Sequence, residues 1–366
     1  MPTNLLFEGD NLAILRDLAA THAGRVQCVY LDPPYNTGAT FEHYRDALSH
    51  AQWLTMMRER LLAILPLLRS SGFICVQIDD RQLAYLQLLM DEIFGRERRV
   101  STVVVKMSEL SGVKMSHVES RLPKLKEYLL IYAAGDEAKL RPIRVQKSPE
   151  VLQNYLKYYT NIIENPESPV EAWQIVRVRD FMKARGLSTE AAKVREFQLR
   201  EQERVVYRTN NPHLSELSFP TQTAEVLSPT GVRYVWWEGK QMLFLKDHTE
   251  EYLGDLWTDI STINLNKEGG GRFRYSKKPE ALIARVLRLL SDEGDLVLDA
   301  FAGSGTTGAV AQKLGRPWVM IERGEHLHTH IVPRIEAIRA GTDQGGLQPY
   351  QHGPPFRLIP AAANGG

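Results

Sequence analysis

Leu31-Asp32-Pro33-Pro34-Tyr35-Asn36-Thr37-Gly38 places a carboxylate, two rigid prolines and an aromatic ring directly after an apolar run. The preceding residues, 26–31, have the nearly continuous apolar pattern of a strand buried on both faces of a parallel sheet. The prolines end this strand, because they cannot donate to the ladder and they restrict their predecessors to extended geometry. The carboxylate and the ring are therefore expected at the carboxyl edge of the sheet, where open α/β folds bind ligands.

This stretch has the chemistry to hold a planar amine. Asp32 can accept one hydrogen of an exocyclic NH2 group, the Pro33 carbonyl can accept the other, and Tyr35 can stack on the ring. The alternative is a strand-ending Pro-Pro turn in which the acid and the ring have no chemical role. The choice between the two depends on the rest of the chain.

The composition is that of an ordinary folded protein with one large domain or two smaller ones, since 366 residues are 43% hydrophobic and 24% charged. No apolar run approaches membrane-spanning length, and Met1-Pro2-Thr3-Asn4 does not resemble a signal peptide, so we expect no membrane association. Cys28 and Cys75 lie in apolar runs and are expected as buried thiols. The net charge of +1 neither indicates nor excludes nucleic-acid binding, because charge can be local.

Strands and helices alternate over residues 1–135, which predicts an α/β domain with helices on both faces of a sheet. The alternation fails over 136–250 and resumes over 251–340. We therefore interpret 136–250 as an inserted domain. Residues 341–366 are rich in Gly, Pro, Gln and Ala, which predicts a disordered tail.

The inserted region is basic. Ser168-Pro169-Val170-Glu171 has the spacing of a helix start, and a second helix is predicted over 189–204. These segments carry many cations, among them Arg177, Arg179 and Lys183, which are candidates for contact with phosphates. A solvated charged helix face explains the same pattern equally well.

A second motif lies downstream. Phe301-Ala302-Gly303-Ser304-Gly305-Thr306-Thr307 follows a strand that contains Asp299 and opens a helix, and the next strand ends on Glu322. A glycine turn and an acid about 20 residues later are typical of an adenosine-binding unit. The three-glycine dinucleotide pattern and the phosphate-binding loop are both missing from the sequence, which favours a nucleoside with a charged, non-phosphate tail, such as S-adenosylmethionine. A simple tight connection is the alternative.

The two motifs together, with Asp-Pro-Pro-Tyr upstream and the glycine turn downstream of a long insert, resemble the permuted β-class DNA amino-methyltransferases of the adenine-N6 type, including the modification subunits of type III restriction systems. The resemblance covers residues 1–135 and 251–340. It implies a Rossmann-like, seven-stranded sheet with circularly permuted motif order, and it makes the insert a smaller target-recognition domain by position alone.

The resemblance also implies a site-specific activity: methyl transfer from S-adenosylmethionine to a flipped-out adenine in double-stranded DNA, without a metal. The implied catalytic residues are Asp32, Pro33, Pro34 and Tyr35. The implied cofactor-binding residues are Asp10, Lys278, Asp299, Phe301, Gly303, Ser304, Gly305, Thr306 and Glu322, with Lys278 at the methionine carboxylate, Glu322 at the ribose and Asp10 at the adenine edge. The substrate-binding candidates are Asn36, Phe41, Tyr44, Arg177, Arg179 and Lys183.

Several alternatives stay open at this point. Cytosine N4 or an RNA adenine would accept the same grip, and a catalytically silent DNA-recognition subunit is a different class of function. The family further implies a homodimer, a separate restriction subunit as a partner, and a cytoplasmic, nucleoid-associated location in a prokaryote. His326, His328 and His330 alternate, but on a helix that spacing diverges, which favours a surface role over a metal site.

Overall fold

The computed structural model of the chain describes residues 4–36, 48–108, 122–210, 224–227, 232–237, 239–263, 265–270, 277–343 and 345–360. The chain forms two compact units, one made of Met1–Pro142 with Gly254–Gly366 and the other of Ile143–Leu253. The antiparallel pair β6 (Arg144–Gln146) and β13 (Glu250–Tyr252) opens and closes the second unit. The insert therefore begins and ends later than the predicted bounds of 136 and 250.

The larger unit is built on a sheet with the strand order β14-β4-β5-β3-β2-β15-β16-β1-β17, which is nine strands within the described residues. Their bounds are β1 (Asn4–Glu8), β2 (Val26–Leu31), β3 (Leu68–Ile78), β4 (Arg99–Lys106), β5 (Lys126–Ala133), β14 (Leu256–Trp257), β15 (Leu296–Asp299), β16 (Trp318–Glu322) and β17 (Phe356–Ile359). The seven inner strands form the predicted Rossmann-like sheet. The two edge strands, β14 and β17, were not predicted.

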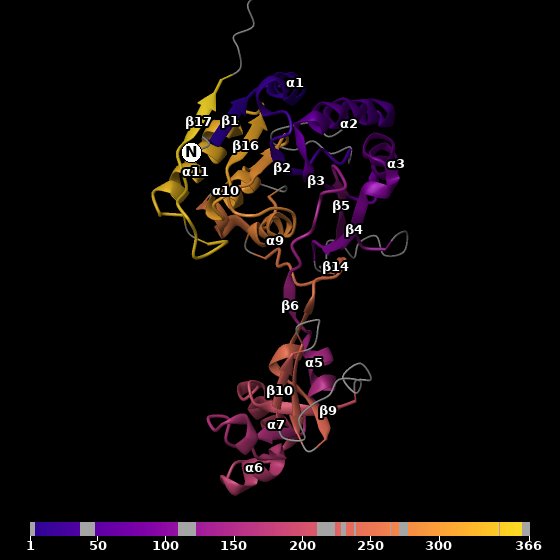
Figure 1. The fold of residues 1–366 in the computed structure, drawn as a ribbon. Coiled ribbons are helices and arrows are strands. Elements are labelled where there is room, and N and C mark those ends of the chain that lie inside the picture. The colour runs from indigo at the N-terminus through magenta and orange to yellow at the C-terminus, as the bar shows by residue number, and fades with distance from the viewer. Residues whose placement is uncertain are drawn as a thin grey trace, which may run out of the picture. The chain divides into compact units, whose positions relative to one another are not determined.

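Helices cover both faces of this sheet (Figure 1). They are α1 (Asn11–His22), α2 (His50–Ile64), α3 (Leu83–Phe94), α9 (Glu280–Leu290), α10 (Thr306–Lys313) and α11 (Val332–Arg339). The first three helices pack with Val29 and Leu31 of β2 in one apolar core. Gly308 of α10 instead touches Met320, which points to the other face of its strand. All six residues of β2 are buried, as the apolar run before Asp32 predicted.

Residues 345–360 are ordered, although the sequence predicted a disordered tail over 341–366. β17 pairs in parallel with β1, and the Gln312 side-chain amide donates to the carbonyls of His352 (2.7 Å) and Pro354 (3.2 Å). The composition misled the prediction because β17 has few apolar residues. It forms a strand by pairing with the edge strand β1, a pairing that the local sequence does not reveal.

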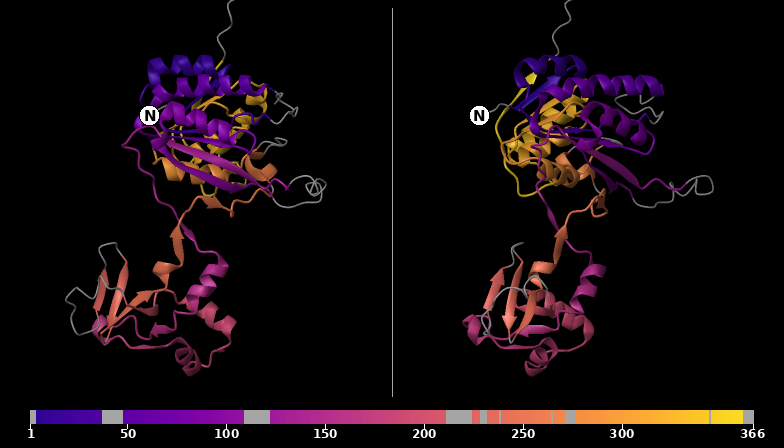
Figure 2. Two further views of the ribbon diagram at one scale, coloured as in Figure 1. Left: turned by 90° about the vertical axis from the view of Figure 1, so that its right-hand side faces the viewer. Right: turned by 45° about the vertical axis from the view of Figure 1, so that its right-hand side comes forward.

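The smaller unit contains a six-stranded sheet with the order β10-β11-β12-β9-β7-β8, counted within the described residues. Figures 1 and 2 show the strands and helices of this unit from three directions. Its elements are α5 (Pro149–Leu156), β7 (Asn161–Ile163), β8 (Ile175–Arg177), α6 (Val178–Ala184), α7 (Ala191–Arg200), β9 (Val205–Thr209), β10 (Ala224–Leu227), β11 (Arg233–Trp237) and β12 (Lys240–Phe244). The helix predicted from Ser168 is wrong: only a short turn forms at Val170–Ala172, because the Asn165 side chain binds the backbone of Ala172 and Gln174 and leads the chain into β8. Among the helices of the described residues, none is both long enough and apolar enough to cross a lipid bilayer.

A buried ionic network lies behind the glycine turn of the larger unit. Glu280 accepts hydrogen bonds from Lys313 (2.9 Å) and from Arg334 (2.8 Å), and Lys313 also pairs with Asp343 at 2.5 Å. All four side chains are at most 3% exposed. Arg334 further donates to the Ser304 carbonyl at 3.1 Å. Two cations and two anions balance, and the network ties α9, α10 and α11 to the turn.

We predict that Arg334→Met lowers the free energy of unfolding by about 3–5 kcal/mol, because it leaves an uncompensated charge in this network. Urea unfolding monitored by circular dichroism measures the change. Arg58→Met is the matched control: its ion pair with Glu92 is exposed at both ends, so a much smaller loss than in Arg334→Met is expected. An equal loss in both variants would contradict the prediction.

Candidate active site

The site lies at the carboxyl edge of the sheet, where β2, β15 and β16 are parallel neighbours. Leu298 of β15 pairs with Val29 of β2, and Asp299 pairs with Met320 of β16. The same edge therefore carries the ends of three strands whose sequences lie far apart. A cavity of about 690 Å³ opens there. The predicted site residues that line it are Asp10, Asp32, Pro34, Lys278, Asp299, Phe301, Gly303, Ser304, Thr306 and Glu322.

The other candidates lie elsewhere. Pro33, Tyr35, Asn36 and Gly305 are in the same unit but do not line the cavity, and Phe41 and Tyr44 fall outside the described residues. Arg177, Arg179 and Lys183 belong to the smaller unit, where all three are exposed around the start and end of α6.

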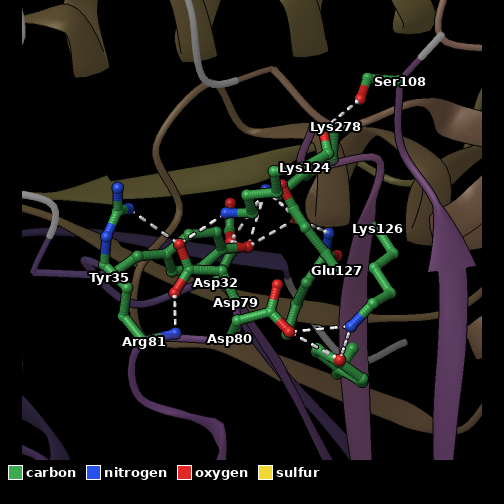
Figure 3. A network of polar contacts seen from close by, with 12 residues as sticks. Asp32, Tyr35, Asp79, Asp80, Arg81, Ser108, Lys124, Lys126, Glu127 and Lys278 are labelled. Carbon is green, nitrogen blue, oxygen red and sulfur yellow. Dashed lines mark hydrogen bonds and ion pairs between the residues drawn. The ribbon is translucent and has the colours of Figure 1, made fainter. Parts of the chain in front are cut away.

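Asp32 is held by a compact polar cluster (Figure 3). The Tyr35 hydroxyl lies 2.8 Å from Asp32 Oδ1 and 2.8 Å from Glu127 Oε2. The Lys278 ammonium lies 3.2 Å from Asp32 Oδ1, 3.1 Å from Glu127 Oε2 and 2.9 Å from the Tyr35 oxygen. Lys278, predicted at the cofactor carboxylate, is thus bound to both acids of this cluster.

The partners of Asp32 all use one of its two oxygens. Within the part of the chain that the structure describes, Oδ1 receives Tyr35 and Lys278, and no hydrogen bond to Oδ2 or to the Pro33 carbonyl is found. The indole N–H of Trp53 donates to the Pro34 carbonyl at 2.6 Å and thereby holds the segment that follows Asp32. Asp32 therefore has one oxygen fixed and one available, on a backbone that cannot easily move.

Burial and charge act in opposite directions on this cluster. Burial is the main cause that raises the pKa of Asp32, and Lys278 opposes it. Burial by itself would lower the pKa of Lys278, but the carboxylates of Asp32 and Glu127 raise it, so this amine is charged. The pKa of Glu127 is lowered in spite of its burial, through Lys278 and hydrogen bonds from Gln77 and Tyr35.

Tyr35 serves the cluster through its hydroxyl, and its ring does not line the cavity. The Lys278 ammonium lies 4.9 Å from the ring centroid, and Lys124 approaches it at 5.8 Å. The stacking role of this ring stays a prediction. Its observed contacts indicate that Tyr35 also orients Asp32.

The glycine turn forms the opposite end of the cavity. Gly303 and Gly305 have φ angles of 52° and 73°, a left-handed conformation that favours glycine. The Gly303 N–H donates to Glu322 Oε2 at 2.8 Å, and the N–H groups of Arg323 and Gly324 donate to Oε1 at 2.9 Å each. Glu322 thus fixes the turn from the neighbouring strand, a contact that the sequence did not suggest.

Asp299 lies at the base of the turn with 2% of its surface exposed. Burial raises its pKa to about 7, although the Phe301 N–H at 2.8 Å and the Thr307 hydroxyl stabilise the ionised form. Backbone donors and His326 lower the pKa of Glu322 in spite of its burial. Glu322 is therefore stabilised as a carboxylate, whereas Asp299 has no counter-charge among the described residues.

Asp10 caps α1 by accepting from the Leu12 (3.0 Å) and Ala13 (3.3 Å) N–H groups, and Arg60 lies 3.4 Å away. Arg60 also donates to Asn11. The sequence reasoning missed Arg60 and His326, which line the cavity, and Glu127, which binds Tyr35 and Lys278. The signals for Glu127 were its place before an apolar run and the weak match of the segment Glu127-Tyr128-Leu129-Leu130-Ile131-Tyr132 to the family pattern.

His326, His328 and His330 do not converge: His326 lines the cavity, and His328 Nε2 lies 3.2 Å from Glu8. Among the described residues, no group of three or more His, Cys, Asp or Glu side chains is arranged to hold a metal ion.

An acid beside a glycine turn at the carboxyl edge of a Rossmann-like sheet is an arrangement in which such folds bind ligands that contain a nucleoside. The model of the N6/N4 methyltransferase family, described as DNA methylase, matches residues 26–333. This chain therefore belongs to that family of DNA methylases.

Relatives of known type support the same assignment. The chain is 33% identical to the probable type III restriction-modification enzyme HindVI Mod subunit of Haemophilus influenzae, over 94% of this chain and 51% of the relative. It is 25% identical to the type II methyltransferase M.KpnI of Klebsiella pneumoniae, over 84% of this chain and 76% of the relative. These matches to type III Mod subunits cover most of this chain. The chain itself spans about half the length of those subunits.

The fold is shared with a solved structure. PvuII DNA methyltransferase, described as cytosine-N4-specific, superposes with a TM-score of 0.50 and 12% identity, covering 91% of this chain and 87% of that one. At this identity the likeness concerns the fold alone.

We predict that Asp299→Asn stabilises the protein at pH 8 but not at pH 4. With a pKa raised to about 7, the contribution of Asp299 to stability is complete below its unfolded pKa near 4 and is lost as the pH rises through 7. The gain at pH 8 is expected to reach up to about 4 kcal/mol in urea unfolding. The exposed Asp17→Asn is the control, and no gain at pH 8 would contradict the raised pKa.

Proposed function

We propose that this chain is a site-specific DNA adenine-N6 methyltransferase that uses S-adenosylmethionine. The observation that supports it most strongly is that Asp32, with Oδ2 available, and the Gly303 turn line one cavity. A planar amine bound at Asp32 and a nucleoside bound at the Gly303 turn would meet inside this cavity. The type III Mod relatives support DNA as the substrate.

The residues present fit S-adenosylmethionine. Asp10, Asp32, Asp299, Glu322 and Glu325 line the cavity and outnumber its cations Arg60, Lys278 and Arg323. This excess of acids suits a cationic ligand with ribose hydroxyls rather than a phosphate. We assign Asp299, Gly303 and Ser304 to the methionine part, Glu322 to the ribose and Asp10 to the adenine edge. The cofactor, when bound, supplies an electrophilic methyl group.

The protein contributes orientation at the amine. Asp32 Oδ2 and the Pro33 carbonyl would accept the two amine hydrogens, which turns the nitrogen lone pair out of the ring plane. Pro33 and Pro34 keep both acceptors on stiff backbone. Tyr35 and Lys278 hold Oδ1, so that the carboxylate does not rotate away. We keep Asn36, Phe41 and Tyr44 as further substrate contacts.

Adenine is favoured over cytosine by the acidic first position of Asp32-Pro33-Pro34-Tyr35, and cytosine N4 is the runner-up. The base must leave the duplex, because its amine is otherwise paired. We assign target recognition to the unit Ile143–Leu253, where the exposed cations Arg177, Arg179 and Lys183 suit phosphate contacts. A separate restriction subunit, a homodimer and a cytoplasmic, nucleoid-associated location are further parts of the proposal.

The test is transfer of label from labelled S-adenosylmethionine to unmethylated double-stranded DNA. We expect label on adenine N6, and we expect Asp32→Ala to reduce transfer by roughly 100-fold or more, since an acceptor for the amine is lost. Calorimetry should show that the variant binds S-adenosylmethionine within roughly threefold of wild type, because Lys278 keeps Glu127 as its partner.

The exposed Asp17→Ala variant is the control for both measurements. Label on cytosine would establish the runner-up. Label on RNA alone, or no transfer by a wild-type protein that binds the cofactor, would refute the proposal.

A further inference from the structure

The cluster behind Asp32 contains a cation, Lys278, and a second acid, Glu127. We propose that Lys278 and Glu127 are opposing positioning residues for Asp32, with Lys278 keeping its carboxylate ionised and Glu127 limiting that effect. This inference rests on the proposed function, in which an ionised Asp32 accepts the amine hydrogens. It assigns a function to Glu127, and it gives Lys278 a function other than cofactor binding.

The geometry supports a shared cation. The Lys278 ammonium is 3.2 Å from Asp32 and 3.1 Å from Glu127, and its side chain is only 11% exposed. The Tyr35 hydroxyl lies 2.8 Å from an oxygen of each acid but has one proton to donate. Asp32 and Glu127 therefore compete for the same two donors, Lys278 and Tyr35. Removal of one acid strengthens the hydrogen bonds and the ion pair of the other acid.

The other groups that face Asp32 do not replace this cation. Tyr30 of β2 and Asp299 of β15 interact with Asp32 electrostatically, and neither carries a positive charge. Gln77 of β3 donates to Glu127 at 2.6 Å, and Lys124 is paired with Asp79 at 2.6 Å. Among the residues that the structure describes, the inner cluster thus consists of two carboxylates and one ammonium.

Removal of either partner changes the balance in opposite directions. Without the Lys278 ammonium, two buried acids share one hydroxyl, so Asp32 holds its proton up to a higher pH. Without the Glu127 charge, Asp32 has the ammonium to itself and loses its proton at a lower pH. A protonated Asp32 binds the amine poorly, so the rate of methyl transfer falls on the acid side of its titration.

The test is the single-turnover rate of labelled methyl transfer to DNA between pH 5 and pH 9. We expect the acid limb to move up by about one pH unit or more in Lys278→Met and down in Glu127→Gln. The double variant should lie between the two. Lys278→Arg keeps the charge and should keep the limb near that of wild type, even where its rate is lower. Lys124→Met, which removes a cation that faces the same ring, should not move it.

A second readout does not need activity. The carboxyl carbon of Asp32, labelled with 13C and assigned by its loss in Asp32→Asn, should titrate with the same opposite shifts. This titration separates the two proposals. Opposite shifts of the Asp32 titration in a protein that transfers no label would refute the proposed function and support this inference. The same titration of Asp32 in all variants, or shifts in the same direction, would overturn this inference. If Lys278→Met does not fold, Lys278→Arg and Glu127→Gln still decide the question.

Discussion

The parallel pairing of β2 with β15 is the contact on which the site depends. Val29 lies beside Leu298, so the first and last thirds of the chain meet within one sheet. Parallel neighbours end at the same edge, and this brings Asp32 and Asp299 to one cavity whatever their order along the chain. A permuted order therefore costs the site nothing. An insert between the two motifs is tolerated for the same reason, provided that both strands return to the sheet.

Three carboxylates at this edge are stabilised in three different ways. Asp32 has a shared ammonium, and Glu322 has His326 and backbone N–H groups. Asp299 is buried with hydrogen-bond donors but without a counter-charge among the described residues, and burial raises its pKa to about 7. Such an unbalanced acid lowers the stability of the empty protein, and a ligand that brings a positive charge removes the cost. The same imbalance that destabilises the fold therefore favours binding of a cationic cofactor.

Much of the site could be predicted because strand ends are visible in a sequence. An apolar run followed by Asp32-Pro33-Pro34, and another followed by Gly303, fix where the chain reaches the edge. Glu127 could not be placed, because its position depends on β5 lying antiparallel beside β3, a pairing that no local pattern specifies. β17 was missed for a similar reason: its strand exists only because β1 offers a free edge.

The short segment Lys277-Lys278-Pro279-Glu280 connects the two ends of the cavity. Lys278 binds Asp32 at one end of the cavity. Glu280 binds Arg334, which donates to the Ser304 carbonyl of the glycine turn at the other end. Pro279 lies between them in extended geometry at the start of α9, which fixes the spacing of the two side chains. A shift of this segment would therefore disturb the Asp32 cluster and the glycine turn together.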